Sequence, residues 1–164
     1  QVEPEVLMRV TNRYLGYIVE QVEATGGYVD KFIGDGVLAL WGAPASDPQH
    51  AIHGVQAALA VVTRLLQARQ IAATQRQMSF GVKIGVNSGI AMVGNVGTQG
   101  RYNYTAVGET VNVAARLEGV PDLYACQVVV GPETARLIQD TFLLCELDTV
   151  RVKGKETALT IFTE

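Results

Sequence analysis

Apolar residues recur every three or four positions along two long stretches of the chain. The first covers residues 6–22 and predicts an amphipathic helix that ends before Gly26-Gly27. The second begins after Asp47, a residue that favours helix N-termini, and predicts a helix that ends near Gln70. Its expected buried stripe consists of Ile52, Val55, Ala58, Leu59, Val62, Leu65 and Leu66.

Two short runs of β-favouring residues lie between these helices, at residues 28–33 and 37–43. The sequence Gly34-Asp35-Gly36 separates them and is a strong turn signal. The pattern therefore predicts a β-hairpin.

Further elements follow the second helix. Residues 80–86 and 101–108 predict strands, whereas the intervening residues 87–100 contain four glycines and indicate turns, a close backbone approach or a mobile arm. Residues 109–120 predict a helix and residues 127–131 a short strand.

The last part of the chain predicts a helix that starts at Pro132 and two strands within residues 143–164, around the turn Lys153-Gly154-Lys155. Hairpins then outnumber strand–helix–strand crossovers, which indicates an α+β fold with a mainly antiparallel sheet flanked by helices. With one more strand before Gln1, the order would be ferredoxin-like, β-α-β-β-α-β.

Composition narrows the class of protein. The chain has 164 residues, of which 48% are hydrophobic, so we expect residues 1–164 to form one domain. Its 13 basic and 16 acidic residues give a net charge of −3, and no general attraction to nucleic acid or to an anionic membrane is expected. An anionic substrate would have to be held by local cations.

Cysteine content and hydropathy suggest a location. The two cysteines, Cys126 and Cys145, form neither a disulfide framework nor a thiol metal site, so we expect a reducing compartment and a cytoplasmic protein. The sequence contains no run of 18 or more consecutive apolar residues and so predicts no membrane segment. The chain opens on Gln1 directly into helical periodicity, and we expect it to be a domain of a longer protein.

Asp35 is the first residue that could carry chemistry. A carboxylate between two glycines at a strand end leaves room for a hard cation and for the phosphates bound to it. Mg²⁺ typically takes one or two protein carboxylates and fills its other positions with water and phosphate oxygens. The alternative is that this Asp serves only the hairpin turn, and the local sequence alone favours that interpretation.

Lys31 lies four residues before Asp35 on the same predicted strand. At about 3.3 Å per residue their backbones are roughly 13 Å apart, too far for an easy ion pair, so the two side chains need different partners. Lys31 is either an edge residue with its ammonium in solvent or a donor to a base edge or a phosphate.

Asn112 and Arg116 lie four residues apart on one predicted helix, so both project from the same face. An amide beside a guanidinium suits a ribose and a charged phosphorus centre. A solvated helix face is the alternative, although the small apolar residues around the pair favour a packed surface or a cleft. Those neighbours are Val113, Ala114 and Ala115.

Two further pairs of residues have a plain and a functional interpretation. Lys153 and Lys155 either form a solvated hairpin tip or supply a flexible cation that closes on a polyphosphate. His50 and His53 are three residues apart near a helix start and could bind a metal from one face. Because no further His or Cys ligand is near in the sequence, we interpret them as surface residues.

Four segments, taken together, carry a resemblance to a known family. They are "DKFIGDGVLALWGAP", "GVKIGVNSGIAMVGNVG", "YTAVGETVNVAARLEG" and "VKGK". In this order, and across nearly the whole chain, they resemble the catalytic domain of the class III nucleotidyl cyclases. The resemblance implies that family's fold and the conversion of ATP to 3′,5′-cyclic AMP and pyrophosphate.

The resemblance also implies roles for single residues. Asp35, in the pattern F-x-G-D, corresponds to a ligand of the catalytic metals, which are two Mg²⁺ or Mn²⁺ ions in this family. Lys31 corresponds to a residue that contacts adenine. Asn112 corresponds to a ribose contact, Arg116 to an α-phosphate contact and Lys153 to a phosphate-binding lysine.

A second base-reading residue of ATP-selective members lies seven positions before the helix Asn, which is Thr105 here. Many adenylyl cyclases have Asp there, and Thr resembles the subclass that includes cyanobacterial and mammalian soluble, bicarbonate-responsive enzymes. Bicarbonate regulation is therefore implied. Guanylyl cyclases have Glu and Cys at the two base positions, so Lys31 with Thr105 implies ATP.

The family acts as a head-to-tail dimer, in which one chain supplies the metal aspartates and the other the base-reading residues, the Asn and the Arg. A homodimer with two composite sites is implied. The family's first metal aspartate lies in a pattern like F-x-D-I-x-G-F-T, which residues 1–164 do not contain. We expect that strand to precede Gln1, which would make this domain N-terminally incomplete.

Three other functions remain open at this point. One is a guanylyl cyclase, and another is a catalytically silent cyclase-like domain that dimerises or senses a ligand. The third is a signalling-nucleotide synthase with a related palm-like sheet, which would need neither the Asn112 and Arg116 pair nor Lys153.

Overall fold

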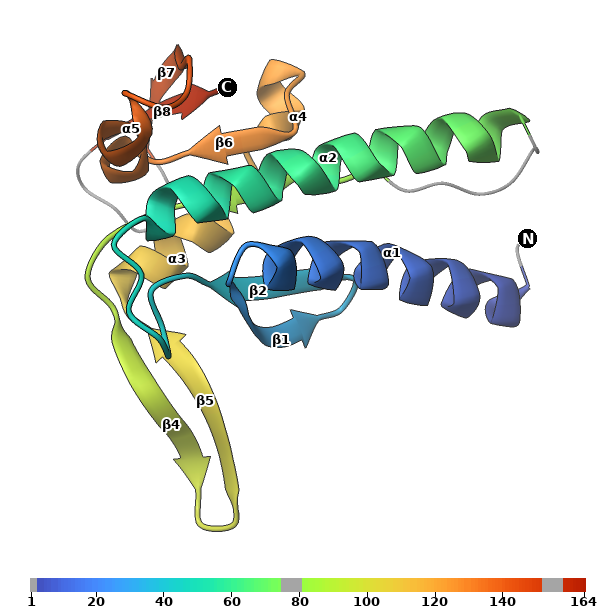
Figure 1. The fold of residues 1–164 in the computed structure, drawn as a ribbon, viewed down its shortest axis with the longest axis horizontal. Coiled ribbons are helices and arrows are strands. Elements are labelled where there is room, and N and C mark those ends of the chain that lie inside the picture. Colours follow the sequence, from blue (N-terminus) through green and yellow to red (C-terminus); the bar gives the residue numbers. More distant parts are fainter. Residues whose placement is uncertain (1–2, 75–80, 152–157) are drawn as a thin grey trace.

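The predicted helices and strands are present in the predicted order, with one further strand and one further short helix, in a computed structural model, which describes residues 3–74, 81–151 and 158–164 (Figure 1). The elements are α1 (Pro4–Ala24), β1 (Tyr28–Ile33), β2 (Gly36–Leu40), α2 (His50–Thr74), β3 (Ile84–Val86), β4 (Met92–Thr98), β5 (Arg101–Val107), α3 (Glu109–Leu117), α4 (Pro121–Tyr124), β6 (Val128–Val130), α5 (Pro132–Ile138), β7 (Cys145–Val150) and β8 (Leu159–Thr163). The turn predicted at Lys153-Gly154-Lys155 lies outside the described residues.

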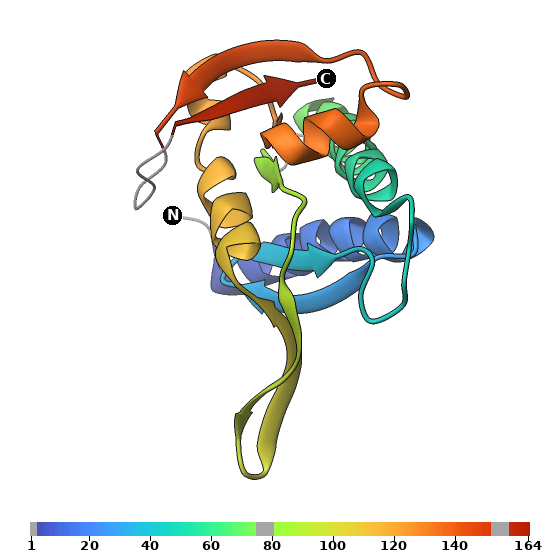
Figure 2. The same ribbon diagram turned by 90° about the vertical axis from the view of Figure 1, so that its left-hand side faces the viewer.

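The strands form three groups. One is the hairpin of β1 and β2, another is a four-stranded sheet in the order β3-β6-β8-β7, and the last is the hairpin of β4 and β5. Among the described strands only β3 and β6 pair in parallel, so the predicted mainly antiparallel α+β fold is confirmed. Figures 1 and 2 show the β4-β5 hairpin projecting away from the rest of the molecule.

Strand lengths differ from the predictions where a strand's partner ends. β2 stops at Leu40 because its pairing partner is Tyr28, the first residue of β1. β3 has three residues because β6 offers only three partners. The glycine-rich residues 87–100 contain a regular strand, β4, whose backbone is held by pairing with β5 from Met92 to Thr98.

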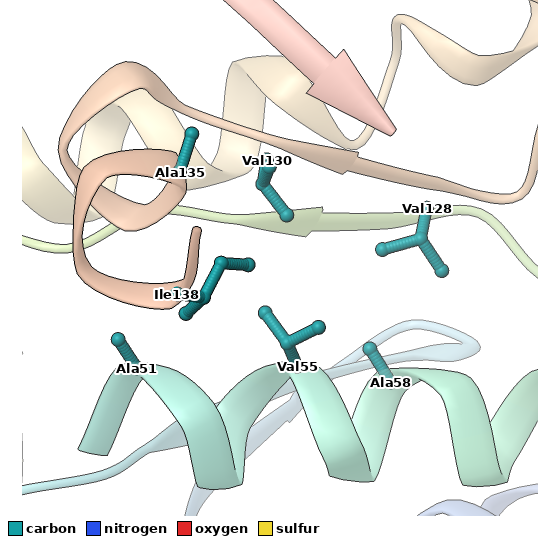
Figure 3. Packing of buried hydrophobic residues seen from close by; sticks show 7 residues of the cluster. All are labelled: Ala51, Val55, Ala58, Val128, Val130, Ala135 and Ile138. Carbon is teal, nitrogen blue, oxygen red and sulfur yellow. The ribbon is translucent and has the colours of Figure 1, made fainter. Parts of the chain in front are cut away.

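The main core lies between α2, β6 and α5. Side chains of α2 face two valines of β6 and the inner face of α5 in Figure 3. These residues are Ala51, Val55, Ala58, Val128, Val130, Ala135 and Ile138. The predicted stripe of α2 is therefore largely correct, but Leu66 at its end is 44% exposed.

The middle valine of β6 faces the opposite way. Val129 packs with Val113 and Leu117 of α3 and with Ile161 of β8 in a second cluster. Because side chains alternate along a strand, three consecutive valines can serve two cores. This second core fixes α3 against the sheet.

Helix α2 is also long and apolar enough to cross a membrane, judged by length and composition alone, over His50–Ala73 at a mean hydropathy of 1.2. A buried helix in the centre of a domain gives the same signal. One face of α2 forms the main core, and 39% of this apolar stretch is buried.

Helix α3 meets β3 at Gly85 with no space for a side chain. A Cβ at Gly85 would overlap the carbonyl oxygen of Ala114 and the backbone nitrogen of Glu118, and would lie 2.8 Å from the carbonyl carbon of Leu117. These are all backbone atoms, so α3 itself would have to move.

Replacing Gly85 with Ala is therefore expected to lower the free energy of unfolding by about 1–3 kcal/mol, since overpacking forces a backbone shift. Urea denaturation measures the change. Gly94→Ala is the matched control, because nothing lies within 4 Å of a Cβ added there. Equal losses in the two variants would contradict the close approach.

Candidate functional site

The β1-β2 hairpin places Asp35 in a two-residue loop. Ile33 pairs with Gly36, and Gly34 has a φ of +63°, which suits the first position of a tight hairpin turn. The predicted turn is confirmed, and the Asp35 side chain is exposed at its tip. The turn and a ligand role are thus compatible at this position.

The charge of Asp35 reaches helix α1. Burial raises the pKa of Tyr14, and the negative charges of Asp35 and Glu118 raise it further. Within residues 3–74, 81–151 and 158–164, no group of three or more His, Cys, Asp and Glu side chains could hold a metal ion. An exposed carboxylate fits one position of Mg²⁺ or Mn²⁺, with the others left to further ligands.

Lys31 lies at a β-bulge in β1. Val29 pairs with Ala39 and Lys31 with Leu38, so Asp30 between them has no partner on β2. The Lys31 ammonium lies 3.6 Å from Asp30 Oδ1, and its side chain is 43% exposed. Its observed ionic neighbour is thus Asp30, in keeping with the expectation that Lys31 and Asp35 have different partners.

Thr105 lies on β5 and is buried. Its hydroxyl donates a hydrogen bond to Asp30 Oδ2. The two residues that the resemblance assigns to the base, Lys31 and Thr105, therefore both contact one carboxylate. The sequence did not predict that Asp30 contacts both Lys31 and Thr105. The only sequence signal for Asp30 was that it is an acidic residue inside a strand of mostly apolar residues.

Asn112 and Arg116 lie on α3, directly after β5. Asn112 is exposed, and the Arg116 side chain is 31% exposed. The Arg116 Nη1 atom lies 3.7 Å from Glu109 Oε1, and this nitrogen is buried without a hydrogen-bond partner. A buried guanidinium nitrogen without a hydrogen bond suits an anionic ligand.

Lys153, the remaining predicted site residue, lies outside the described residues. The two histidines both contact Asp47: His50 Nδ1 is 3.1 Å from its carbonyl oxygen, and His53 Nδ1 is 2.7 Å from its carboxylate. The hydrogen bond with His53 lowers the pKa of Asp47. These contacts give the histidines a structural role at the start of α2.

A hollow of about 180 Å³ lies beside the start of α3, where Glu109 and Thr110 line part of it. Thr105, Asn112 and Arg116 do not line it. Sites for small-molecule ligands usually have volumes of about 300–1,000 Å³. This hollow therefore does not combine the predicted site residues into a nucleotide pocket.

Apolar side chains are exposed on the projecting hairpin and next to it. They are Phe32 and Ile33 on β1, and Ile90, Met92, Val93, Val96, Tyr102 and Val107 on or beside the β4-β5 hairpin. Grouped apolar exposure of this kind is typical of a protein interaction surface.

The fold is the one expected of a nucleotide cyclase domain, and comparison with known families agrees. The family described as the adenylate and guanylate cyclase catalytic domain matches residues 1–164. The chain therefore belongs to this family, and the class III cyclase fold expected from the sequence is confirmed.

The similar proteins include both adenylyl cyclases and guanylyl cyclases. The chain is 36% identical over 159 residues to adenylate cyclase 1 of Rhizobium meliloti, covering 97% of this chain but only 24% of that protein's length. Its fold matches the adenylyl cyclase CyaB from P. aeruginosa, with a TM-score of 0.89, 29% identity and coverage of 99% of this chain and 83% of the other. The guanylyl cyclase Cya2 matches almost equally, with a TM-score of 0.88, 29% identity and coverage of 98% and 81%.

Proposed function

We propose that the protein is an adenylyl cyclase that converts ATP to 3′,5′-cyclic AMP and pyrophosphate. The observation that carries this proposal is the cluster of Lys31 and Thr105 around Asp30. An ammonium is a donor that suits the acceptor N1 of adenine, and a hydroxyl can accept from the exocyclic amino group. The adenylate cyclase of Rhizobium meliloti supports the same substrate.

The phosphate end of the substrate would lie along α3. Asn112 and Arg116 are one helical turn apart and follow β5, which carries Thr105. Asn112 is proposed to hold the ribose and Arg116 the α-phosphate, while Lys153 is proposed to bind the leaving pyrophosphate.

In the proposed reaction, the ribose 3′-oxygen attacks the α-phosphorus, and the bond from that phosphorus to the bridging oxygen of the pyrophosphate breaks. Negative charge on the α-phosphoryl oxygens is stabilised by the guanidinium of Arg116. Asp35 would hold Mg²⁺ or Mn²⁺, whose chemistry is to acidify the 3′-hydroxyl and to neutralise the pyrophosphate.

A homodimer with composite sites is part of the proposal. Lys31 lies on β1 with Asp30 as its ionic neighbour, whereas Asp35 lies in the exposed turn after that strand. One protomer would supply Asp35, and its partner the base-reading residues with α3. The exposed apolar side chains on and near the β4-β5 hairpin offer a surface for this pairing.

The test is an assay of the full-length protein with ATP or GTP and Mg²⁺ or Mn²⁺, in which cyclic nucleotide and pyrophosphate are separated and quantified. We expect kcat/KM for ATP to exceed that for GTP by about tenfold or more. A preference for GTP would favour the second candidate, a guanylyl cyclase, which the similarity to Cya2 supports. If neither ATP nor GTP yields a cyclic nucleotide and pyrophosphate, the result would favour a catalytically silent domain.

Substrate choice should follow the two base-reading residues. Replacing Lys31 with Glu and Thr105 with Cys together is expected to shift the ratio of kcat/KM towards GTP by about tenfold or more, because the new groups suit guanine. Parallel assays with both nucleotides measure the shift. If the double variant stays active and keeps the ATP preference, these residues do not read the base.

A further inference from the structure

Asp30 is a buried carboxylate to which the proposed reaction gives no task. Its side chain is 0% exposed. Oδ2 accepts the hydrogen bond from Thr105, whereas Oδ1 is buried and has no hydrogen-bond partner, although the Lys31 ammonium lies 3.6 Å away. Burying a carboxylate with incomplete hydrogen bonding is costly, so an apolar residue would serve stability better. The cost indicates a role in the site.

The bulge in β1 explains how Asp30 reaches both neighbours. A bulged residue has no partner across the ladder, and the bulge breaks the usual alternation of side chains along a strand. Asp30 can therefore lie close to the Lys31 ammonium, although the two residues are adjacent in sequence. The same carboxylate reaches Thr105, which is on β5.

The contact between β1 and β5 does not depend on Asp30 alone. The rings of Tyr28 and Tyr104 meet edge to face, with centroids 5.6 Å apart and planes at 88°. The Tyr28 hydroxyl also donates to the Tyr104 carbonyl oxygen at 3.5 Å. These contacts should keep the two strands together in a variant that lacks the Asp30 carboxylate.

We propose that Asp30 is a positioning residue that determines specificity: it makes the Thr105 hydroxyl an acceptor towards the base and so selects adenine over guanine. This inference rests on the proposed function of the site as a nucleotide cyclase. Asp30 contacts no substrate atom in this scheme, because it acts through Thr105 and Lys31.

The direction of the hydrogen bond from Thr105 to Asp30 determines which base the site selects. A carboxylate only accepts, so the single proton of the Thr105 hydroxyl points to Asp30 rather than to the more distant Ala106 carbonyl oxygen at 3.5 Å, and the oxygen lone pairs remain for the base. The amino group at C6 of adenine is a donor and matches them, whereas the oxygen at C6 of guanine is an acceptor and does not. Asp30 Oδ1 meanwhile keeps the Lys31 ammonium, which is only a donor, next to Thr105.

Asp30→Asn is the direct test because it keeps the shape and replaces one acceptor oxygen by a donating NH₂ group. The Lys31 ammonium attracts the remaining oxygen, so the NH₂ group faces Thr105 and the threonine proton can turn to the base. The ratio of kcat/KM for ATP to that for GTP is expected to fall by about tenfold. Asp30→Ser, whose hydroxyl both donates and accepts, is expected to lower the ratio as well.

Three controls separate this role from a structural one. Asp148→Asn is the matched variant, because Asp148 accepts a 2.7 Å hydrogen bond from the Tyr124 hydroxyl on another part of the molecule, and its ratio should equal that of the wild type. In a Thr105→Val background, Asp30→Asn should not change the ratio further, whereas a purely structural effect would persist. Thermal unfolding midpoints identify any variant that has lost its fold.

Equilibrium binding of non-cyclisable ATP and GTP analogues gives a second readout of the same selectivity. If either Asp30 variant folds and retains the wild-type ratio in binding and turnover, the role of Asp30 is overturned. If the wild-type protein cyclises neither nucleotide, the proposed function fails, while the binding ratios still test Asp30. If the wild-type protein prefers GTP, both proposals fail.

Discussion

Replacing Arg116 with Ala is expected to lower kcat for ATP by at least about tenfold, with little change in the free energy of unfolding. The guanidinium has a buried nitrogen without a hydrogen-bond partner, and the nearby Glu109 carboxylate is 3.7 Å away. Its proposed partner is charge that develops on the α-phosphoryl oxygens. Steady-state kinetics with ATP, together with urea denaturation, measure both quantities.

Arg136→Ala is the matched control for that variant. Arg136 is on α5, with a side chain that is 63% exposed, and it forms a 2.7 Å ion pair with Glu133 on the same helix. Loss of such a surface pair should leave kcat unchanged. A near-normal kcat for the Arg116 variant would remove its assigned role, and an equal loss in both variants would indicate a nonspecific effect of lost charge.

Replacing Asp35 with Asn is expected to lower the cyclase rate by about 100-fold at any Mg²⁺ or Mn²⁺ concentration, because a neutral amide is a poorer ligand for a hard cation. Since Asp35 is exposed in the hairpin turn, the free energy of unfolding should change by no more than about 0.5 kcal/mol. Initial rates over a metal titration give the first quantity and urea denaturation the second.

The comparison variant for this experiment is Asp122→Asn. Asp122 is also exposed and forms a 2.6 Å ion pair with Lys83, away from the β1-β2 turn. It should retain the wild-type rate and metal dependence. A rate for the Asp35 variant equal to that of Asp122→Asn would show that Asp35 is only a turn residue.

Elements set by local signals could be predicted from the sequence. Glycines after residue 25 end α1, and Gly34 at positive φ makes the hairpin turn where the pattern places it. The spacing of Asn112 and Arg116 places both on α3. In each case the deciding interactions lie within a few residues along the chain.

Features set by distant partners could not be predicted. β4 forms in a glycine-rich segment because β5 supplies its hydrogen-bond partners. Asp30 gave only a weak signal, because a bulge breaks the alternation on which strand patterns depend and its contact with Thr105 joins residues 75 positions apart. Lys31 and Thr105 were paired only through the family resemblance, since no local pattern connects β1 with β5.

The approach of α3 to β3 at Gly85 has a consequence for how new substrates can evolve on this scaffold. The helix that carries Asn112 and Arg116 is held against β3 by backbone contacts at Gly85 as well as by the side chains of the second core, and single substitutions elsewhere hardly alter the backbone contacts. By contrast, β1 and β5 meet through side chains such as Asp30 and Thr105, which a point mutation replaces. Under the proposed function, selection could therefore exchange one nucleobase for another while the geometry of phosphoryl transfer is inherited unchanged.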